Sequence, residues 1–131
     1  GVLKLIQHYK QNGITLVLAS SASMDNIDMI FKKFDLDQYF ISKISGADLK
    51  ASKPNPEIFE KAAKLSGHPK KKCLVIEDAT NGILAAKSAG IFCVAFDGGH
   101  SKNQDYSIAD LVINKFESIY LEKLRSIKFP S

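Results

Sequence analysis

The chain has 131 residues, of which 45% are hydrophobic and 24% are charged. This length predicts one domain, residues 1–131, that buries roughly two thirds of the surface its unfolded chain would expose. The ordinary apolar content and the net charge of +4 exclude a disordered chain. The apolar runs Ile14–Ala19 and Ile91–Phe96 are far shorter than the roughly 20 residues of a membrane-spanning helix, so no membrane partner is expected.

The cysteines and the basic residues indicate the compartment and the partners. Cys73 and Cys93 each lie inside an apolar run, which predicts buried free thiols and therefore a reducing, cytoplasmic setting. The sequence pI is about 9.0, yet Arg125 is the only arginine among 18 basic residues. Because the planar guanidinium is the group that most often reads bases and clamps phosphate pairs, we expect no nucleic-acid partner.

Helical and strand patterns alternate along the chain. Strands are predicted where apolar residues run continuously, and helices where apolar residues recur with helical spacing or where capping residues stand at the ends. In chain order these are a helix at Val2–Gln11, a strand at Ile14–Ala19, a helix at Met24–Phe34, a strand at Ile41–Ile44, a helix from about Pro56 to Gly67, a strand at Cys73–Ile76, a helix at Asn81–Ala89, strands at Ile91–Phe96 and Leu111–Ile113, and a helix near Glu117–Ile127.

Two of these helices have further support from single residues. Ile27, Ile30, Phe31 and Phe34 form one apolar stripe on the helix at Met24–Phe34. For the helix near Pro56, Asn55 is a suitable N-cap. The alternation with short connections predicts a Rossmann-like, doubly wound α/β fold, in which a parallel sheet lies between two layers of helices.

Polar residues with complementary chemistry follow the predicted strands. Ser20 and Ser21 follow the first strand, Glu77 and Asp78 follow the strand at Cys73–Ile76, and Lys53 precedes a helix. Because ligands of open parallel sheets bind at the carboxyl ends of the strands, we expect these side chains at one edge of the sheet. Hydroxyls, an ammonium and two neighbouring carboxylates suit a phosphate bound beside Mg²⁺.

Each of these residues also has a simpler structural interpretation. Ser20, Ser21 and Ser23 are residues of a type preferred at helix caps. Lys53 fits a solvated surface, and the acidic pair fits the positive end of a helix dipole. An acidic pair that directly ends a buried strand is nevertheless costly unless it is paired or bound to a metal. The joint placement of the residues, more than any one of them, favours a binding site.

Three segments resemble known signature motifs. Leu16–Ser23 (LVLASSAS), Ser52–Ala63 (SKPNPEIFEKAA) and Val75–Gly90 (VIEDATNGILAAKSAG) resemble the second, third and fourth motifs of the haloacid dehalogenase-like (HAD) hydrolase superfamily, in the family's order. The branch that they resemble is that of β-phosphoglucomutase and phosphoglycolate phosphatase. The resemblance extends from about Gly1 to Ile113.

The resemblance implies a role for each candidate residue. Ser20 matches the serine that binds phosphate, and Ser21 adds a backbone or hydroxyl contact. Lys53 matches the lysine that contacts the phosphate and the nucleophile. Glu77 and Asp78 match the acidic pair that serves Mg²⁺, with Asp78 as the more direct ligand.

The sequence departs from the family at its first motif. The family's nucleophile is the first aspartate of a D-x-D motif on an earlier strand, whereas Asp35–Asp37 has that spacing but follows a helical stripe. The cap domain that selects substrate is also absent. The chain is therefore expected to be a C-terminal core portion of a longer enzyme. In the family the D-x-D strand lies between the strands that correspond to Ile14–Ala19 and Cys73–Ile76, and its absence predicts open edges that pair directly, recruit another chain (self-association) or belong to a larger protein.

The resemblance implies Mg²⁺-dependent phosphoryl transfer on a small phosphorylated metabolite, most naturally a sugar phosphate, by a β-phosphoglucomutase or a sugar-phosphate phosphatase. Without the nucleophile, this chain is expected to be inactive alone. The alternative is a non-catalytic phosphate- and metal-binding remnant or a regulatory partner. A phosphorylation-receiver domain is disfavoured because its acidic pair comes first in the chain, and a dinucleotide-binding domain because G-x-G-x-x-G is missing.

Overall fold

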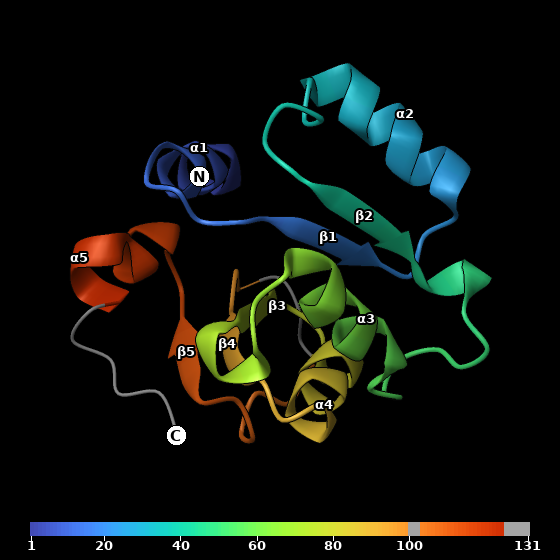
Figure 1. The fold of residues 1–131 in the computed structure, drawn as a ribbon. Helices are drawn as coiled ribbons and strands as arrows, with labels where there is room; N and C mark the ends of the chain where they lie inside the picture. The colour runs from blue at the N-terminus through green and yellow to red at the C-terminus, as the bar shows by residue number, and fades with distance from the viewer. Residues whose placement is uncertain (100–102, 125–131) are drawn as a thin grey trace.

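The computed structural model describes residues 1–99 and 103–124 and has the predicted alternation of helices and strands (Figure 1). The helices α1 and α2 have the predicted bounds, and each predicted strand is present within a few residues of its expected position. The elements are α1 (Val2–Gln11), β1 (Val17–Ser20), α2 (Met24–Phe34), β2 (Ser42–Ser45), α3 (Glu57–Ser66), β3 (Leu74–Glu77), α4 (Thr80–Ser88), β4 (Phe92–Phe96), β5 (Leu111–Ile113) and α5 (Leu121–Leu124), with short 3₁₀ turns at Gly46–Asp48, Lys70–Lys72 and Phe116–Ile119.

The C-terminal helix differs from its prediction. A 3₁₀ turn at Phe116–Ile119 and the single helical turn α5 stand where one helix to Ile127 was expected, and residues 125–127 lie outside the described residues. At α3 the expected N-cap is displaced by one residue: Pro56 directly precedes the helix, and the Asn55 Oδ1 accepts a hydrogen bond from the Glu57 amide at 3.0 Å. Among the described residues, no helix is both long and apolar enough to cross a membrane.

The strands are parallel, as predicted, but they form two hydrogen-bonded sheets instead of one. β1 pairs with β2, and β3, β4 and β5 pair in that order. Within the described residues β1 and β3 are not hydrogen-bonded to each other, so each has one unpaired edge. Direct pairing of these two strands, one of the three expected outcomes, is therefore not what the chain does.

Helices cover both faces of the larger sheet. On one face, α4 packs on β3 and β4, while α3 packs beside α4 and against β1 and β2 of the smaller sheet. Together these helices form a buried cluster that includes Ile58, Phe59, Ile83 and Ala86. On the other face, α1, the turn at Phe116–Ile119 and α5 form a second cluster with residues of β3, β4 and β5. The predicted layered α/β architecture is thus confirmed (Figure 1).

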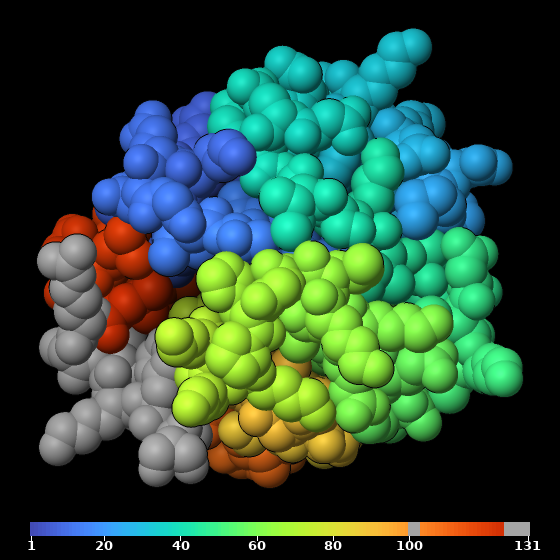
Figure 2. Space-filling model, in the orientation of Figure 1, coloured from blue at the N-terminus to red at the C-terminus, as the bar shows by residue number. Residues whose placement is uncertain are grey.

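The two ends of the described chain lie side by side, as the blue and red surfaces in Figure 2 show. The Tyr9 hydroxyl donates to the Ile119 carbonyl at 2.7 Å, and the Leu121 amide donates to the His8 Nε2 at 3.1 Å. The ring of His8 stacks on that of Tyr120 with centroids 4.4 Å apart. These contacts fix α1 against the C-terminal turns.

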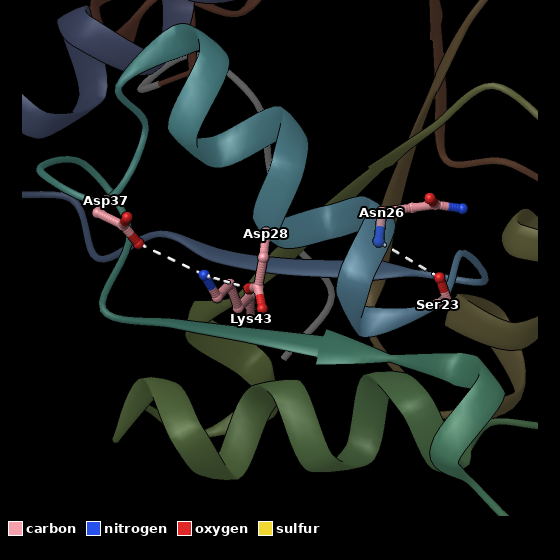
Figure 3. A network of polar contacts seen from close by, with 5 residues as sticks. All are labelled: Ser23, Asn26, Asp28, Asp37 and Lys43. Carbon is pink, nitrogen blue, oxygen red and sulfur yellow. Dashed lines mark hydrogen bonds and ion pairs between the residues drawn. The ribbon is translucent and has the colours of Figure 1, made fainter.

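A lysine on β2 fixes α2 to the smaller sheet (Figure 3). The Lys43 ammonium lies 2.7 Å from the Asp28 carboxylate and 3.5 Å from that of Asp37, and it sits 4.6 Å above the centre of the Phe31 ring. The hydrogen bond with Asp28 is the largest cause of the raised pKa of Lys43. At the start of the helix, the Ser23 Oγ accepts a hydrogen bond from the Asn26 amide at 3.3 Å.

The apolar stripe of α2 is only half correct as a prediction. Ile27 and Phe31 are buried, whereas Ile30 and Phe34 are 46% and 54% exposed. The smaller sheet has two strands, so it covers a narrower face of α2 than the sequence pattern implies.

This difference predicts unequal effects of the same substitution on one helix. Phe31→Ala should lower the free energy of unfolding by about 3–5 kcal/mol, because Phe31 is 1% exposed and its removal leaves a cavity. The matched control Phe34→Ala should change it by no more than about 0.5 kcal/mol. Urea denaturation measures both, and equal effects would contradict the arrangement of α2.

The two cysteines differ in their environment. Cys93 is buried, and burial, followed by the charges of Glu77 and Asp110, raises its pKa to about 12. Cys73 is only half-buried, and its Sγ contacts the Pro69 carbonyl at 3.4 Å. The prediction of free thiols is confirmed, although only Cys93 is fully enclosed.

We expect a thiol reagent to distinguish these residues. In the native chain near pH 8, Cys73 should be alkylated and Cys93 should remain unmodified, because the reactive thiolate is scarce and enclosed at Cys93. Mass spectrometry after limited labelling with iodoacetamide measures the ratio. Rapid modification of Cys93 without unfolding would show that the sheet opens around β4.

Candidate functional site

The first part of the site is the carboxyl end of β1. Ser20 is the last residue of this strand and stands opposite Ser45 of β2. The Ser20 Oγ accepts a hydrogen bond from the Ala22 amide at 3.1 Å, and Ser21 is exposed. The capping role considered for these serines belongs to Ser23, which leaves the Ser20 hydroxyl outside the α2 cap.

The second part is an ion pair between residues 24 positions apart. The Lys53 Nζ lies 3.3 Å from the Glu77 Oε2, and the two side chains are only 12% and 14% exposed. The Lys53 ammonium also lies 5.1 Å from the centre of the Phe59 ring. A solvated surface position for Lys53 is therefore excluded, and the charges of this pair compensate each other in a largely dry environment.

Burial and neighbouring charges act on Glu77 in opposite directions. Burial raises its pKa, the ammonium of Lys53 and its hydrogen bond lower it, and the carboxylate of Asp78 raises it again; the net effect is a raised pKa. A carboxylate in this position is stabilised by a nearby cation, which Lys53 supplies and which a metal ion would also supply.

A glycine in α4 makes room for this carboxylate. A Cβ built on Gly82 would lie 1.3 Å from the Glu77 Oε2 and 2.7 Å from its Cγ, so any side chain here would displace Glu77. Gly82 is in the first turn of α4, where the free amides of a helix favour a negative charge. The G of the E-D-x-x-x-G pattern thus has a steric role that the sequence alone did not indicate.

Asp78 differs from Glu77 because it is exposed. Its backbone carbonyl accepts a hydrogen bond from the Tyr106 hydroxyl at 3.1 Å. The Thr80 amide donates to the Gln104 Oε1 at 2.6 Å, and the Thr80 Oγ1 accepts from the Asp105 amide at 2.7 Å. Residues 104–106 therefore hold the segment from Asp78 to Thr80, which leads from the acidic pair into α4.

Sequence reasoning missed this contribution of Gln104 and Tyr106. No local pattern relates residues that are 24 to 28 positions apart. Only the return of the chain after β4 to the carboxyl edge of the sheet brings them to α4.

Helix α3 connects the two parts of the site. The centre of the Phe59 ring lies 5.1 Å from the Lys53 ammonium. The neighbouring Ile58 lies near Gly46: a Cβ added to Gly46 would be 3.5 Å from the Ile58 Cδ1 and 3.3 Å from the Ser20 carbonyl oxygen. Among the described residues, no hydrogen bond or ion pair joins Ser20 directly to Lys53, Glu77 or Asp78. Lys53 and Glu77 therefore contact each other directly, whereas Ser20 and Lys53 share α3 as a common neighbour.

Glu77 and Asp78 are the residues that fit a metal ion. Described residues 1–99 and 103–124 contain no group of three or more His, Cys, Asp or Glu side chains placed to hold one. Two neighbouring carboxylates nevertheless match the way Mg²⁺ is bound, since this ion takes one or two protein carboxylates together with water and phosphate oxygens.

These features define an α/β protein in which a serine, a lysine and two adjacent acidic residues lie at or near the carboxyl ends of parallel strands. A family profile described as haloacid dehalogenase-like hydrolase matches residues 1–90. The chain therefore belongs to the haloacid dehalogenase-like hydrolases, and the resemblance seen in its motifs is confirmed.

Individual relatives agree with this assignment. The chain is 37% identical over 124 residues to the bifunctional riboflavin kinase/FMN phosphatase of Arabidopsis thaliana, with 94% of this chain and 33% of the relative covered. It is 34% identical over 124 residues to the β-phosphoglucomutase of Bacillus subtilis (strain 168), with 95% and 52% covered. The crystal structure of CbbY from Rhodobacter sphaeroides in complex with phosphate superposes with a TM-score of 0.86 at 28% identity, with 95% and 57% covered. The chain thus spans about one third to just over half of the length of these relatives.

The steric role of Gly82 is tested by a double-mutant cycle with Glu77. Gly82→Ala should destabilise the wild-type chain by about 1–3 kcal/mol, because the new Cβ displaces the Glu77 carboxylate from Lys53. In a Glu77→Ala background the same substitution should be neutral or should stabilise by up to about 1 kcal/mol, because alanine favours a helix over glycine.

Urea denaturation of the four chains measures the coupling between the two positions. A Gly82→Ala substitution with the same effect in both backgrounds would contradict the close approach of Glu77 to α4.

Proposed function

We propose that this chain forms the phosphate- and metal-binding part of an enzyme that transfers phosphoryl groups from small phosphorylated metabolites. The observation that carries the proposal is the largely buried Lys53–Glu77 pair beside Asp78 and the start of α4. A largely buried ion pair beside a second, exposed carboxylate at a strand end is an arrangement that is typical of functional sites. We further propose that residues 1–131 are one core domain.

Each residue has a distinct role in this proposal. The Ser20 hydroxyl donates a hydrogen bond to a phosphate oxygen, and Ser21 adds a contact from the same loop. Lys53 neutralises the charge that gathers on the phosphoryl group during transfer. Glu77 and Asp78 hold Mg²⁺, which when bound neutralises charge on the phosphate oxygens.

The nucleophile is proposed to come from outside these 131 residues. Among the described residues, β1 and β3 are each hydrogen-bonded to a strand on one side only. An additional parallel strand that pairs with both free edges would have its carboxyl end beside Ser20 and Glu77. The family's D-x-D strand fits this requirement. Another copy of the chain is the other occupant that open edges attract.

Substrate and acceptor are proposed only by class. The relatives' names include a phosphatase for FMN and a mutase for phosphoglucose, which share a phosphate ester and differ in the rest of the molecule. A sugar phosphate is the substrate that we favour. Transfer to water would make the enzyme a phosphatase, and transfer to a second sugar phosphate would make it a mutase. The free cysteines fit a cytoplasmic location.

Turnover by the isolated chain tests where the nucleophile comes from. With p-nitrophenyl phosphate and Mg²⁺, the 131-residue chain should release no more p-nitrophenol than buffer does, because none of its residues takes the role of the phosphorylated aspartate. Metal-dependent hydrolysis that disappears in Asp78→Asn would overturn the proposal of an outside nucleophile.

Phosphate binding tests the rest of the site. Inorganic phosphate should shift the NMR amide signals of Ser20, Ser21 and Lys53, and Lys53→Ala should weaken binding by about tenfold or more, as expected for a charged hydrogen-bond partner. Lys61→Ala, which removes the same charge from α3, is the matched control. Equal phosphate-induced amide shifts in the wild-type, Lys53→Ala and Lys61→Ala chains would show that Lys53 does not take part in phosphate binding.

A further inference from the structure

The segment Ser20–Ser23, which we name the phosphate loop, rests on the carboxyl end of β2. The Ser45 Oγ donates a hydrogen bond to the Ala22 carbonyl at 2.6 Å and accepts one from the Ala47 amide at 3.2 Å. Ser45 is 2% exposed. Since its hydroxyl is both donor and acceptor in this arrangement, the direction of its O–H bond is fixed toward the phosphate loop.

The residue after Ser45 meets the same loop by close packing. Gly46 is buried, and a Cβ at this position would lie 3.3 Å from the Ser20 carbonyl oxygen and 3.3 Å from the Ser21 Cα. Both neighbours are backbone atoms, so they yield less readily than the end of a flexible side chain. Glycine therefore lets β2 approach the phosphate loop more closely than any other residue would.

These contacts determine the direction of the Ser20 hydroxyl. The Ala22 amide donates to the Ser20 Oγ, and this occupies a lone pair and leaves the hydroxyl proton available for an acceptor such as a phosphate oxygen. Ala22 is in turn held by Ser45, whose hydroxyl donates a hydrogen bond to the Ala22 carbonyl. A continuous path of two hydrogen bonds thus runs from β2 to the phosphate-binding hydroxyl.

We propose that Ser45 and Gly46 are positioning residues for phosphate binding: they hold the phosphate loop so that the Ser20 hydroxyl points toward the anion. Neither residue touches the phosphate. The inference rests on the proposed function, since it assigns these residues to the site that binds the phosphoryl group.

The test compares phosphate affinity with stability. Inorganic phosphate is titrated into the 131-residue chain, and the dissociation constant is taken from the amide shifts of Ser20, Ser21 and Ala22. Ser45→Ala should raise this constant by about tenfold, as expected when one buried hydrogen bond is lost. Ser42→Ala, the same substitution at the opposite end of β2, should leave it unchanged.

Gly46→Ala is the second variant, because it keeps the Ser45 hydroxyl and moves only the loop. It should also weaken phosphate binding severalfold, with the amide signals of residues 20–22 displaced even without phosphate. Urea denaturation of each variant separates this effect from a general loss of stability. A merely structural role would lower the free energy of unfolding and leave the dissociation constant of the folded chain as it was.

The outcomes separate the inference from the function on which it rests. Weaker binding in Ser45→Ala and Gly46→Ala, with Ser42→Ala unchanged, supports the positioning role. Wild-type affinity in folded Ser45→Ala and Gly46→Ala chains overturns it and leaves the proposed function intact. A wild-type chain whose phosphate loop does not respond to phosphate overturns the proposed phosphate site, and the positioning role with it.

Discussion

Parallel pairing is the constraint from which the rest of the site follows. Neighbouring strands of a parallel sheet end at the same edge, so the register decides which side chains lie there: Ser20 beside Ser45 in the smaller sheet, and Glu77 beside Ala95 in the larger one. Helices α2 and α4 begin within a few residues of the carboxyl ends of β1 and β3, so the free amides of their first turns lie near these strand ends. The direction of the strands therefore determines which polar side chains lie at their carboxyl ends.

Strands that are hydrogen-bonded on one side only are less buried than a strand that has neighbours on both sides. Every residue of β1 and β3 is half-buried, whereas the first four residues of β4, which has a neighbour on both sides, are fully buried. The open edges of β1 and β3 leave backbone groups that a further strand would satisfy. These open edges are the observation that supports the proposal of one additional strand carrying the nucleophile.

The sequence predicted local features well because their signals are local. The bounds of α1 and α2 follow from apolar spacing and capping residues. The candidate site residues, Ser20, Lys53, Glu77 and Asp78, were selected because each stands near a predicted strand or helix end. The exposure of Ile30 and Phe34 could not be predicted, since it depends on how wide a sheet α2 covers. The spacing of apolar residues shows that a helix has an apolar face, and the size of its partner decides how much of that face is buried.

The contacts that orient the site were not predictable for a related reason. Ser45 acts on Ala22 across 23 positions, and Tyr106 acts on Asp78 across 28. A serine at a strand end and a tyrosine in a loop are common, and nothing in their neighbours marks them. Gly82 is an intermediate case: it belongs to a recognisable motif, yet its reason for being glycine appears only when the Glu77 carboxylate is placed against it.

The acidic pair divides two tasks that a single carboxylate would perform poorly. Glu77 is enclosed, and its Oε2 is engaged by Lys53, so its position is fixed but its charge is already partly compensated. Asp78 is exposed, and its backbone is held by Tyr106, so its carboxylate remains free to meet a cation that arrives from solvent. If Asp78 were as buried as Glu77, its unpaired charge would destabilise the folded chain. If Glu77 were as exposed as Asp78, Lys53 would lose the ion-pair partner that orients it. The different burial of these two adjacent carboxylates, one in the last position of β3 and the other just beyond it, therefore supports a proposed site in which Glu77 also orients Lys53 and Asp78 is the more direct metal ligand.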